Sequence, residues 1–448
     1  MKFCTLTLGC KVNQFETWAM ENILLSRGHE SARAGDGCDV CIINTCTITA
    51  NSAGKSRRAI RRLKKLEPDA FIGVCGCLSQ LESDDMLLLG VELIGGSGNR
   101  SEFVDKLEDL YYRFTSNAES HNDVFPYILI DDPGKRKEIE KLCCGLPTCF
   151  ENSDNIKLSR TRALLKIQDG CNNFCAYCII PYARGRSRSL SPDVIKDQAV
   201  LLGCQGFREI VITGIEISSY GKDLPDCPKL FSVLQSVSDA APNARIRLGS
   251  LDPSLITTEF CDELGKMPNL CDHFHLSVQS GCDETLYRMK RKYRTEDVQN
   301  AISLLRDYFP NCGITGDLLV GFPGETDEEF NRTRHFVENA AFSDMHIFPF
   351  SARPGTSAAK MPNKVMDSVK KKRIRLISEI ASESALSFKH AQIGSVHDVL
   401  IESKRNGYWV GYTTNYIEVH VKENVNRNDI LKTKIVSVDD GVAFGKFV

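Results

Sequence analysis

The stretch QDGCNNFCAYCIIP, residues 168–181, holds Cys171, Cys175 and Cys178 in a C-x3-C-x2-C arrangement. A β-type run, Leu164–Ile167, precedes it, so the cysteines follow the end of a predicted strand. Three thiolates at this spacing can bind three irons of a cubane cluster and leave the fourth iron open for a small molecule. Zinc commonly takes four ligands in paired C-x2-C units, and no second pair follows. The motif therefore predicts an iron–sulfur site with an open position.

Strand and helix patterns alternate downstream of this motif. Five more β-type runs follow, with helical stretches between them, at Glu209–Thr213, Arg245–Gly249, His273–Val278, Gly316–Val320 and Met345–Phe350. Repeated β-α units of this kind close, fully or in part, into a TIM-like barrel with its chemistry at the carboxyl ends of the strands. We expect a partial (β/α)6 barrel over residues 155–385, and an α/β fold class for the chain.

Two further domains are expected beside the barrel. Residues 1–140 begin with alternating strands and helices, which favours a parallel α/β domain. Residues 97 to about 158 are rich in charge and show a weaker strand and helix pattern, and residues 151–156 are predicted to be a domain boundary. Short β-type runs separated by Gly and Asn over residues 386–448 indicate a small C-terminal β-barrel.

The composition narrows the class of protein. No signal peptide or apolar run long enough to span a membrane is visible among the 448 residues, so we expect a cytoplasmic protein. Structural disulfides are rare in that compartment, which leaves the 19 cysteines available for metal. The formal net charge of −2 excludes a global basic field, so any contact with nucleic acid must be local.

A second set of cysteines, Cys10, Cys46 and Cys77, falls at predicted strand ends in the N-terminal domain. The carboxyl ends of parallel strands face one crevice, so these cysteines could converge on a second cluster. Gly9 and Gly76 would let the backbone turn tightly beside it. Other cysteines lie nearby and small buried cysteines are common, so the residues alone leave a core role open.

The order of these motifs resembles the radical S-adenosylmethionine (SAM) methylthiotransferase family over nearly the whole chain. The matching stretches are Gly9-Cys10, Asn44-Thr-Cys46, Gly76-Cys77, the C-x3-C-x2-C motif with Ile180-Pro-Tyr-Ala-Arg-Gly-Arg186, His275–Leu286, Gly321–Thr326 and Phe350–Thr356. The resemblance implies two 4Fe–4S clusters, one on each cysteine triad, and SAM as both methyl donor and radical source. Because the cofactors then carry the hard chemistry, no separate catalytic side chain is expected.

The resemblance also indicates residues of a SAM pocket. Tyr177 resembles the family's adenine-contacting position, and Thr213-Gly214-Ile215-Glu216 resembles the motif whose acidic residue receives the SAM amino group. Near later strand ends, three polar residues could line the same pocket or make ordinary polar pairs: Ser250, Gln279 and Asp317.

The sequence LGCKVNQFET, residues 8–17, resembles that of the family branch that acts on N6-threonylcarbamoyladenosine at tRNA position 37. Branches acting on isopentenyladenosine 37 or on a ribosomal-protein aspartate are the alternatives. The resemblance implies the anticodon stem-loop of tRNA as a partner, an electron donor such as flavodoxin or ferredoxin, and no membrane partner; the sulfur donor stays unknown. A two-cluster electron carrier would need four-cysteine sites, and a radical RNA methylase would not need the second triad.

Local basic residues could contact RNA phosphates, with a solvated surface as the alternative. Arg57 and Arg61 belong to a cationic helix, and Arg291 belongs to a basic run at 290–294. Arg184 and Arg186 follow the cysteine motif, where a phosphate or the SAM carboxylate is the expected partner.

The C-terminal region resembles the TRAM domain, and its aromatic residues could stack on bases or fill the barrel core: Tyr408, Trp409, Tyr412 and Tyr416.

Overall fold

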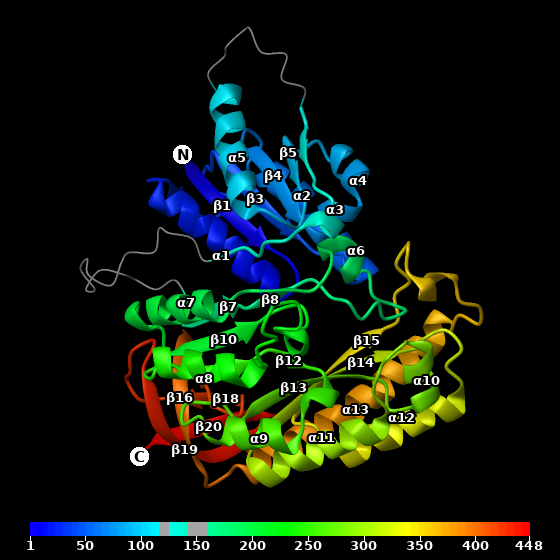
Figure 1. Cartoon of the computed structure of the whole chain (residues 1–448). Coiled ribbons are helices and arrows are strands. Elements are labelled where there is room, and N and C mark those ends of the chain that lie inside the picture. Colours follow the sequence, from blue (N-terminus) through cyan, green and yellow to red (C-terminus); the bar gives the residue numbers. More distant parts are fainter. Residues whose placement is uncertain (116–124, 142–159) are drawn as a thin grey trace. The chain divides into compact units, whose positions relative to one another are not determined.

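The computed structural model describes residues 1–115, 125–141 and 160–448, which fall into two compact units (Figure 1). Unit 1 comprises Met1–Glu151, Lys166–Leu190 and Ser351–Ala359. Unit 2 comprises Asn152–Leu165, Ser191–Phe350 and Lys360–Val448. The boundary predicted at residues 151–156 lies outside the described residues, and the three predicted domain ranges stay predictions.

Unit 1 is built on a parallel sheet with the strand order β2-β1-β3-β4-β5-β6. The strands are β1 (Lys2–Thr7), β2 (Glu30–Ser31), β3 (Val40–Thr45), β4 (Phe71–Gly76), β5 (Leu93–Gly95) and β6 (Tyr127–Leu129). In the centre, β1 pairs with β3 and β3 with β4, so these three strands end at the same edge. Both β3 and β4 are buried throughout, as expected for central strands covered on both faces. The predicted parallel α/β domain is confirmed.

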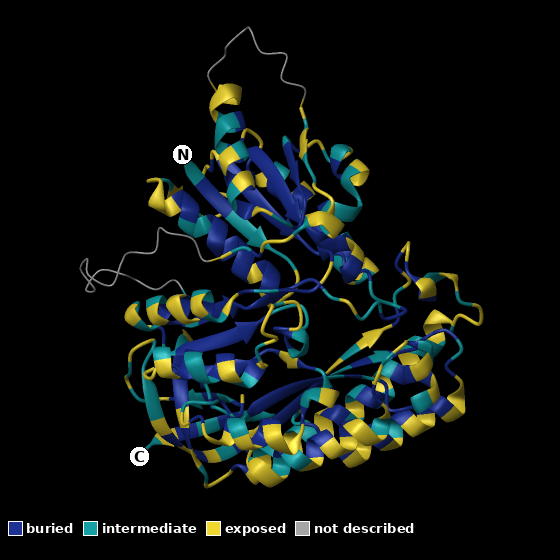
Figure 2. Cartoon of the chain, viewed as in Figure 1, coloured by how far each residue is buried: buried dark blue, intermediate teal, exposed yellow. Residues whose placement is uncertain are grey.

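Helices cover both faces of this sheet, and each face has its own apolar core (Figures 1 and 2). Met20 and Leu24 of α1 (Lys11–Ser26) share one core with Leu107 of α5 (Arg100–Thr115). The other core contains Ile60 of α2 (Ala50–Leu66) and Leu78 of α3 (Cys77–Leu81), beside α4 (Ser83–Leu87). Helix α5 was not predicted, because charged residues between its apolar positions hid the pattern.

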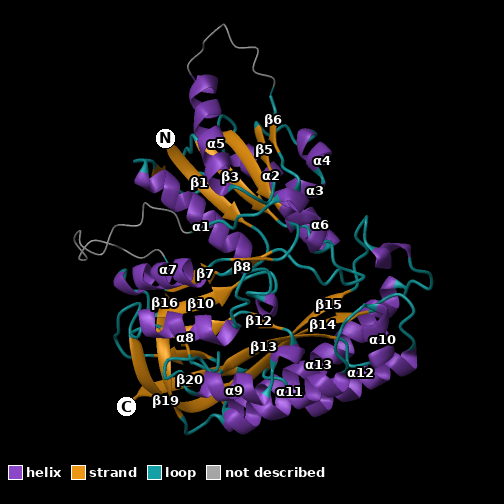
Figure 3. Ribbon diagram, viewed as in Figure 1, coloured by secondary structure: helices purple, strands orange, loops and turns teal. Residues whose placement is uncertain are grey.

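All six predicted barrel strands are present, each within about three residues of its expected bounds (Figure 3). Five of them lie wholly in unit 2, and the first ends at Lys166, where a segment of unit 1 begins. One sheet has the order β11-β10-β7 and the other β12-β13-β14-β15, and the pairings of β10 with β11 and of β12 through β15 are parallel. The strands are β7 (Arg162–Lys166), β10 (Glu209–Thr213), β11 (Arg245–Leu248), β12 (Ser250–Leu251), β13 (His273–Gln279), β14 (Gly313–Val320) and β15 (Asp344–Pro349). This is the expected partial barrel.

Amphipathic helices connect these strands. They are α7 (Pro192–Cys204), α8 (Leu230–Ala240), α9 (Thr258–Gly265), α10 (Asp283–Arg288), α11 (Thr295–Tyr308), α12 (Asp327–Ala340) and α13 (Asp367–Ala391). Within the described ranges, the structure contains no helix with the length and hydrophobicity that crossing a bilayer requires. Thr326 caps α12, and Glu329 completes a capping box, which explains why the sequence located this helix correctly.

The C-terminal region is a closed barrel with the strand order β16-β17-β18-β20-β19, as predicted. Its strands are β16 (Val396–Arg405), β17 (Tyr408–Tyr412), β18 (Glu418–Val421), β19 (Ile430–Asp439) and β20 (Val442–Phe447), the last of which was not predicted. Trp409 packs against the apolar core of this barrel. Tyr412 and Tyr416 stack on each other at 5.1 Å, and the guanidinium of Arg162 lies over both rings.

A buried ion network joins the two barrels of unit 2. The carboxylate of Glu209 on β10 accepts hydrogen bonds from Arg245 Nε at 2.5 Å and Arg247 Nε at 2.8 Å. The same guanidinium groups donate to backbone carbonyls at the C-terminal barrel, those of Tyr412 and Thr414, both at 2.9 Å. Burial alone would raise the pKa of Glu209, but Arg247 and Arg245 hold it far below its usual range. Glu209 therefore holds in place two arginines that anchor the C-terminal barrel.

Replacing Glu209 with Ala leaves these guanidinium groups buried without their carboxylate, so we expect unit 2 to lose about 3–5 kcal/mol of unfolding free energy. Urea denaturation followed by Trp409 fluorescence, in a Trp18→Phe background, measures the change. The matched control is Glu259→Ala, which breaks an ion pair to Lys229 whose side chains are 63% and 62% exposed, and should cost less than about 1 kcal/mol. Equal costs for the two variants would contradict the anchoring role.

Candidate functional site

Three cysteines stand directly after three neighbouring strands of the unit 1 sheet. Cys10 follows β1 and caps α1, Cys46 follows β3, and Cys77 follows β4 and begins α3. Burial, with smaller contributions from the Cys10 and Cys46 thiols, raises the pKa of Cys77 to about 12. Because such an influence acts over a limited distance, the three cysteines lie in one neighbourhood, although 67 positions separate Cys10 from Cys77 in sequence.

Two glycines allow the backbone to pass close to these thiols. Gly9 has φ +106°, and a Cβ there would lie 2.9 Å from the Sγ of Cys46. Gly76 has φ +107°, and its Cβ would lie 2.5 Å from the carbonyl oxygen of Thr45. Any other residue would be strained in this left-handed region and would also collide. The predicted role of both glycines as tight turns beside the cysteines agrees with this geometry.

The exposure of the three thiols differs. Cys46 and Cys77 are 7% and 3% exposed, whereas Cys10 is exposed at the N-terminus of the 16-residue helix α1. Burial raises the pKa of Cys46 and Cys77, and the guanidinium of Arg184 partly opposes this. Three cysteines at one edge of the sheet, beside a buried cation, fit the donor set of a cluster held by three thiolates.

Arg184 connects this triad to the other cysteine motif. Its side chain is fully buried and donates from Nη2 to Asn13 Oδ1 at 2.7 Å and from Nη1 to Glu16 Oε1 at 2.7 Å. It also lies 3.2 Å from both carboxylate oxygens of Asp169, two residues before Cys171. Asn13, three residues after Cys10, donates to the backbone carbonyls of Leu8 and Thr45 at 2.8 and 3.0 Å. One guanidinium thus ties the strand ends to the loop that carries the C-x3-C-x2-C motif.

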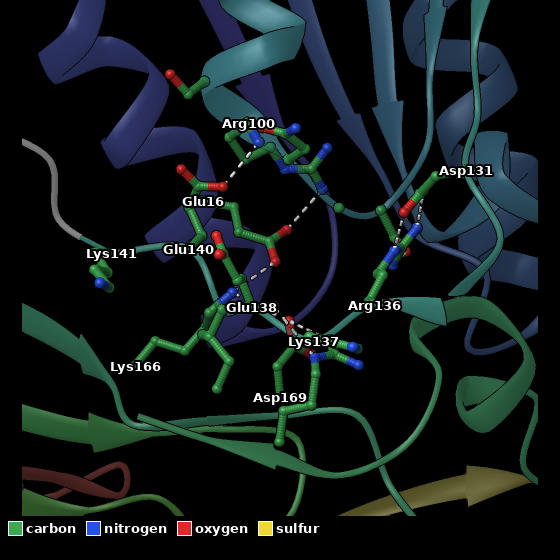
Figure 4. Close-up of a pocket in the computed structure, with 16 residues that line it drawn as sticks. Glu16, Arg100, Asp131, Arg136, Lys137, Glu138, Glu140, Lys141, Lys166 and Asp169 are labelled. Carbon is green, nitrogen blue, oxygen red and sulfur yellow. Dashed lines mark hydrogen bonds and ion pairs between the residues drawn. The ribbon is translucent and has the colours of Figure 1, made fainter. Parts of the chain in front are cut away.

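Glu16 is the central anion of the network, and Figure 4 shows it between Arg100 and Lys166. Arg100 Nη2 lies 2.8 Å from Glu16 Oε2, and Lys166 Nζ lies 3.1 Å from Oε1. Burial alone would raise the pKa of Glu16, but Arg184, Arg100 and Lys166 hold it well below its usual range. Glu16 therefore stays ionised, as a buried carboxylate with three cationic partners should.

The same network forms one wall of a cavity of about 410 Å³ in unit 1 (Figure 4). Arg136 closes another part of the wall, donating from Nε to Asp131 at 2.5 Å and from Nη1 to Ser97 at 2.8 Å. Six cationic and five carboxylate side chains line the cavity, so its walls carry almost no excess charge that would select one kind of small ion.

The loop with Cys171, Cys175 and Cys178 follows β8 (Gln168–Asp169), which pairs with β9 (Arg188–Ser189), and leads into α6 (Ile180–Arg184). The backbone N–H of Cys171 donates to the carbonyl of Gly185 at 3.1 Å, and that of Cys178 to Cys175 at 3.0 Å. Phe174, inside the three-residue spacer, has φ +48°, a conformation that is rare for a bulky residue. The loop is thus held in a tight turn, which is common where a chain wraps a ligand.

Polar residues predicted for a SAM pocket lie at strand ends of unit 2. Thr213 ends β10 and is followed by Gly214, and Ser250 follows β11 on the short strand β12. Gln279 ends β13 at an irregularity in the pairing, with φ +63°. Burial raises the pKa of Glu216, the nearby Asp252 raises it further, and Arg291 lowers it. Tyr177 belongs to unit 1, beside Cys178.

Asp317, the remaining residue predicted for this pocket, lies within β14 and meets two histidines that the sequence did not single out as site residues. Its carboxylate lies 3.2 Å from Nε2 of His275 and 3.3 Å from Nδ1 of His346. Burial alone would raise the pKa of Asp317, but these two imidazoles hold it well below its usual range. The carboxylate is therefore an anion at neutral pH.

The basic residues predicted to contact RNA separate into exposed and buried groups. Arg61 and Arg186 are exposed. Arg57 is bound to Asp85 at 2.6 Å, and Arg291 is bound to Asp252 at 2.9 Å with only 6% of its side chain exposed. The prediction for Arg184 is corrected, because its complete burial among Asn13, Glu16 and Asp169 leaves no surface for a phosphate.

The sequence reasoning missed Asn13, Glu16 and Asp169 as residues of the site. All three stand inside the quoted stretches: Asn13 and Glu16 lie three and six residues after Cys10, and Asp169 lies two before Cys171. Glu16 lies on α1, and its complete burial was not expected, because a glutamate on a helix is ordinarily solvated. The signal that the sequence offered was a polar residue a few positions away from a cysteine predicted to bind metal.

Comparisons with known proteins agree with this arrangement. Residues 165–337 match the family described as the Radical SAM superfamily, and residues 2–94 match one described as Uncharacterized protein family UPF0004. The structure is similar to that of the radical SAM methyltransferase TsrM from Kitasatospora setae, with a TM-score of 0.54 and 14% identity over 80% of this chain and 76% of that one. The fold and the cysteine loop define a radical SAM enzyme.

Relatives in sequence narrow the class further. A Bacillus subtilis (strain 168) protein named threonylcarbamoyladenosine tRNA methylthiotransferase MtaB is 36% identical, over 99% of this chain and 95% of the relative. A Pelotomaculum thermopropionicum protein named tRNA-2-methylthio-N(6)-dimethylallyladenosine synthase is 31% identical, over 90% of this chain and 87% of the relative. The chain belongs to the radical SAM methylthiotransferase family.

The exposure of the N-terminal triad predicts the order of thiol reactivity in chelator-treated protein. At pH 8, iodoacetamide should modify Cys10 at least about a hundredfold faster than Cys77, because the thiolate is the nucleophile and Cys77 is both buried and weakly acidic. The Cys77 rate should rise as the pH approaches 12, the value near which its thiol ionises. Peptide mass spectrometry gives both rates, with the exposed Cys204 as the accessible reference. Equal rates at Cys10 and Cys77 would contradict this geometry.

Proposed function

We propose that this enzyme inserts a methylthio group at C2 of N6-threonylcarbamoyladenosine at position 37 of tRNA, using two 4Fe–4S clusters and SAM. The observation that carries the proposal is the presence of two three-cysteine sites in one compact unit, joined by the Arg184 network. A methylthiotransferase needs a site for the sulfur to be inserted as well as the radical SAM site. The relative with 36% identity carries the name of this activity.

The two triads divide the cofactor roles. Cys171, Cys175 and Cys178 would hold one cluster, and Cys10, Cys46 and Cys77 the other. When bound, the first cluster supplies the electron that cleaves SAM to a radical, and the second carries the sulfur. The protein contributes a buried cation, Arg184, that favours thiolates over thiols at the N-terminal triad.

The SAM contacts predicted from the sequence remain part of the proposal. Tyr177 would contact the adenine, and Glu216 would accept from the SAM amino group, with Thr213 and Gly214 shaping its turn. Glu216 is supported by its place after β10 and by Arg291, which favours its ionised form. Further contacts would come from Ser250 and Gln279. Asp317 was predicted for the same pocket, but its carboxylate lies against His275 and His346.

The RNA contacts use the exposed cations. Lys55, Arg58, Arg61, Arg62 and Lys65 are exposed along α2 and would meet phosphates of the anticodon stem-loop. Arg186 lies over the ring of Phe174 at 5.1 Å, and that ring meets Tyr182, which is 49% exposed, at 5.9 Å. An arginine with two aromatic rings suits an unpaired base. The enzyme would work in the reducing cytoplasm with an electron donor such as flavodoxin or ferredoxin.

Nucleoside mass spectrometry of tRNA tests the substrate. Deleting this gene should remove the 2-methylthio-N6-threonylcarbamoyladenosine peak and leave the unmodified threonylcarbamoyl nucleoside to accumulate. The chain restores the peak when supplied on a plasmid. An unchanged profile contradicts the proposal, and loss of a methylthio-isopentenyladenosine peak instead would assign the enzyme to the second candidate substrate, the one named for the relative with 31% identity.

Cysteine variants test the division of roles. Anaerobically reconstituted enzyme should hold about eight irons per chain, and Cys171→Ala and Cys46→Ala should each lower this towards about four. Cys171→Ala should abolish cleavage of SAM to 5′-deoxyadenosine, whereas Cys46→Ala should keep cleavage and lose methylthiolation. Cys204→Ser, an exposed cysteine outside both triads, is the matched control. Full methylthiolation by either triad variant would contradict the proposal.

A further inference from the structure

Three side chains of metal-ligand type meet on neighbouring strands of unit 2. They are His275 on β13, Asp317 on β14 and His346 on β15, and their ligand atoms all lie within 4.8 Å of one another. The His275 and His346 rings are 5.4 Å apart between centroids. The radical SAM reaction assigns no role to either histidine.

The strand register explains why these side chains converge. His275 pairs with Thr315 across β13 and β14, and Asp317 pairs with His346 across β14 and β15. Paired residues of parallel strands share a face, and so do Thr315 and Asp317, two positions apart on one strand. All four side chains therefore point to the same side of the sheet. The backbone sets this arrangement, so it does not depend on flexible loops.

The distances suit two ligands of one metal ion. The His–Asp separations of 3.2 and 3.3 Å are longer than an ordinary charge-assisted hydrogen bond, which is about 2.7–2.9 Å. Two ligand atoms each about 2.1 Å from an ion and this far apart subtend about 100° at the ion, between the tetrahedral and octahedral angles. The ring of His346 is 60% exposed, and its Nδ1 faces Oδ1 of Asp317, whereas His275 faces Oδ2.

Thr315, which is not one of the three ligand residues, orients the buried side chain of His275. Nδ1 of His275 lies 2.8 Å from the hydroxyl oxygen of Thr315, which leaves Nε2 directed at Asp317. A hydrogen bond at the second ring nitrogen is what holds a metal-binding imidazole in place in proteins. The side chain of His275 is only 11% exposed, so its orientation is well defined.

We propose that His275, Asp317 and His346 bind one divalent first-row transition-metal ion. Two imidazoles and one carboxylate form the donor set that binds iron(II), manganese(II) or zinc(II) with coordination positions left open. The open positions lie on the side of His346, whose side chain is the most exposed of the three. They accept oxygen ligands, either water or a carboxylate or carbonyl of a small molecule. The three ligands belong to unit 2, whereas both cysteine triads belong to unit 1.

Manganese(II) binding to the cluster-loaded full chain tests the proposal. Mn²⁺ prefers oxygen and nitrogen ligands to sulfur, and oxidised 4Fe–4S clusters give no electron paramagnetic resonance signal that would hide it. Loss of the free Mn²⁺ signal should reveal about one bound ion per chain, displaced by Zn²⁺. His346→Gln should weaken binding at least about tenfold, and His346→Asp, which keeps a ligand, should weaken it less.

The matched control is His335→Gln. His335 is 62% exposed and lies 3.0 Å from Glu338, so it is a histidine–carboxylate pair with similar exposure but without a third ligand. This variant should bind Mn²⁺ as the unmodified chain does. Absence of a bound ion in the unmodified chain, or binding of equal strength by His346→Gln and His335→Gln, would show that the three residues form only a hydrogen-bonded group and would overturn the proposal. The readout does not depend on tRNA or on SAM cleavage.

Discussion

A buried guanidinium between two buried carboxylates is the constraint on which the candidate site depends. Arg184 has no exposed surface, and its charge is met by Glu16 and Asp169. Removing one member of such a group leaves an uncompensated charge in the interior, which costs far more than an exposed ion pair. Because Asn13 accepts from the same guanidinium and donates to two strand-end carbonyls, the position of the cysteines is fixed by charge compensation as well as by packing.

The two units use the same physical solution for different purposes. In unit 1, Glu16 accepts hydrogen bonds from three cations and sets the geometry around the cysteine triads. In unit 2, Glu209 accepts from Arg245 and Arg247, whose guanidinium groups also donate to carbonyls of the C-terminal barrel. A carboxylate with several arginine partners provides directional hydrogen bonds that apolar packing lacks. In both cases the network holds segments that are remote in sequence.

The regular elements followed from local pattern where the pattern was strong. Buried strands such as Val40–Thr45 and capped helices such as α12 have bounds close to those expected, because apolar runs and capping residues act over a few positions. The short strands β2, β5 and β6 and the charged helix α5 escaped detection, since two or three residues carry no period and charge masks an apolar stripe. Arg184 was assigned to a phosphate or to the SAM carboxylate, and its burial was not foreseen, because nothing in its neighbouring residues indicates burial.

The sequence by itself determined the class of chemistry. The family is identified by the spacing of Cys171, Cys175 and Cys178 and by the order of motifs along the chain. These signals can be read from sequence because ligand spacing and motif sequence are local properties. Only the tertiary structure decided which distant residues meet. The ends of β1, β3 and β4 bring Cys10, Cys46 and Cys77 to one edge, and the register of β13 to β15 places two histidines beside Asp317. Strand order and register are long-range properties, and no short stretch of sequence contains them.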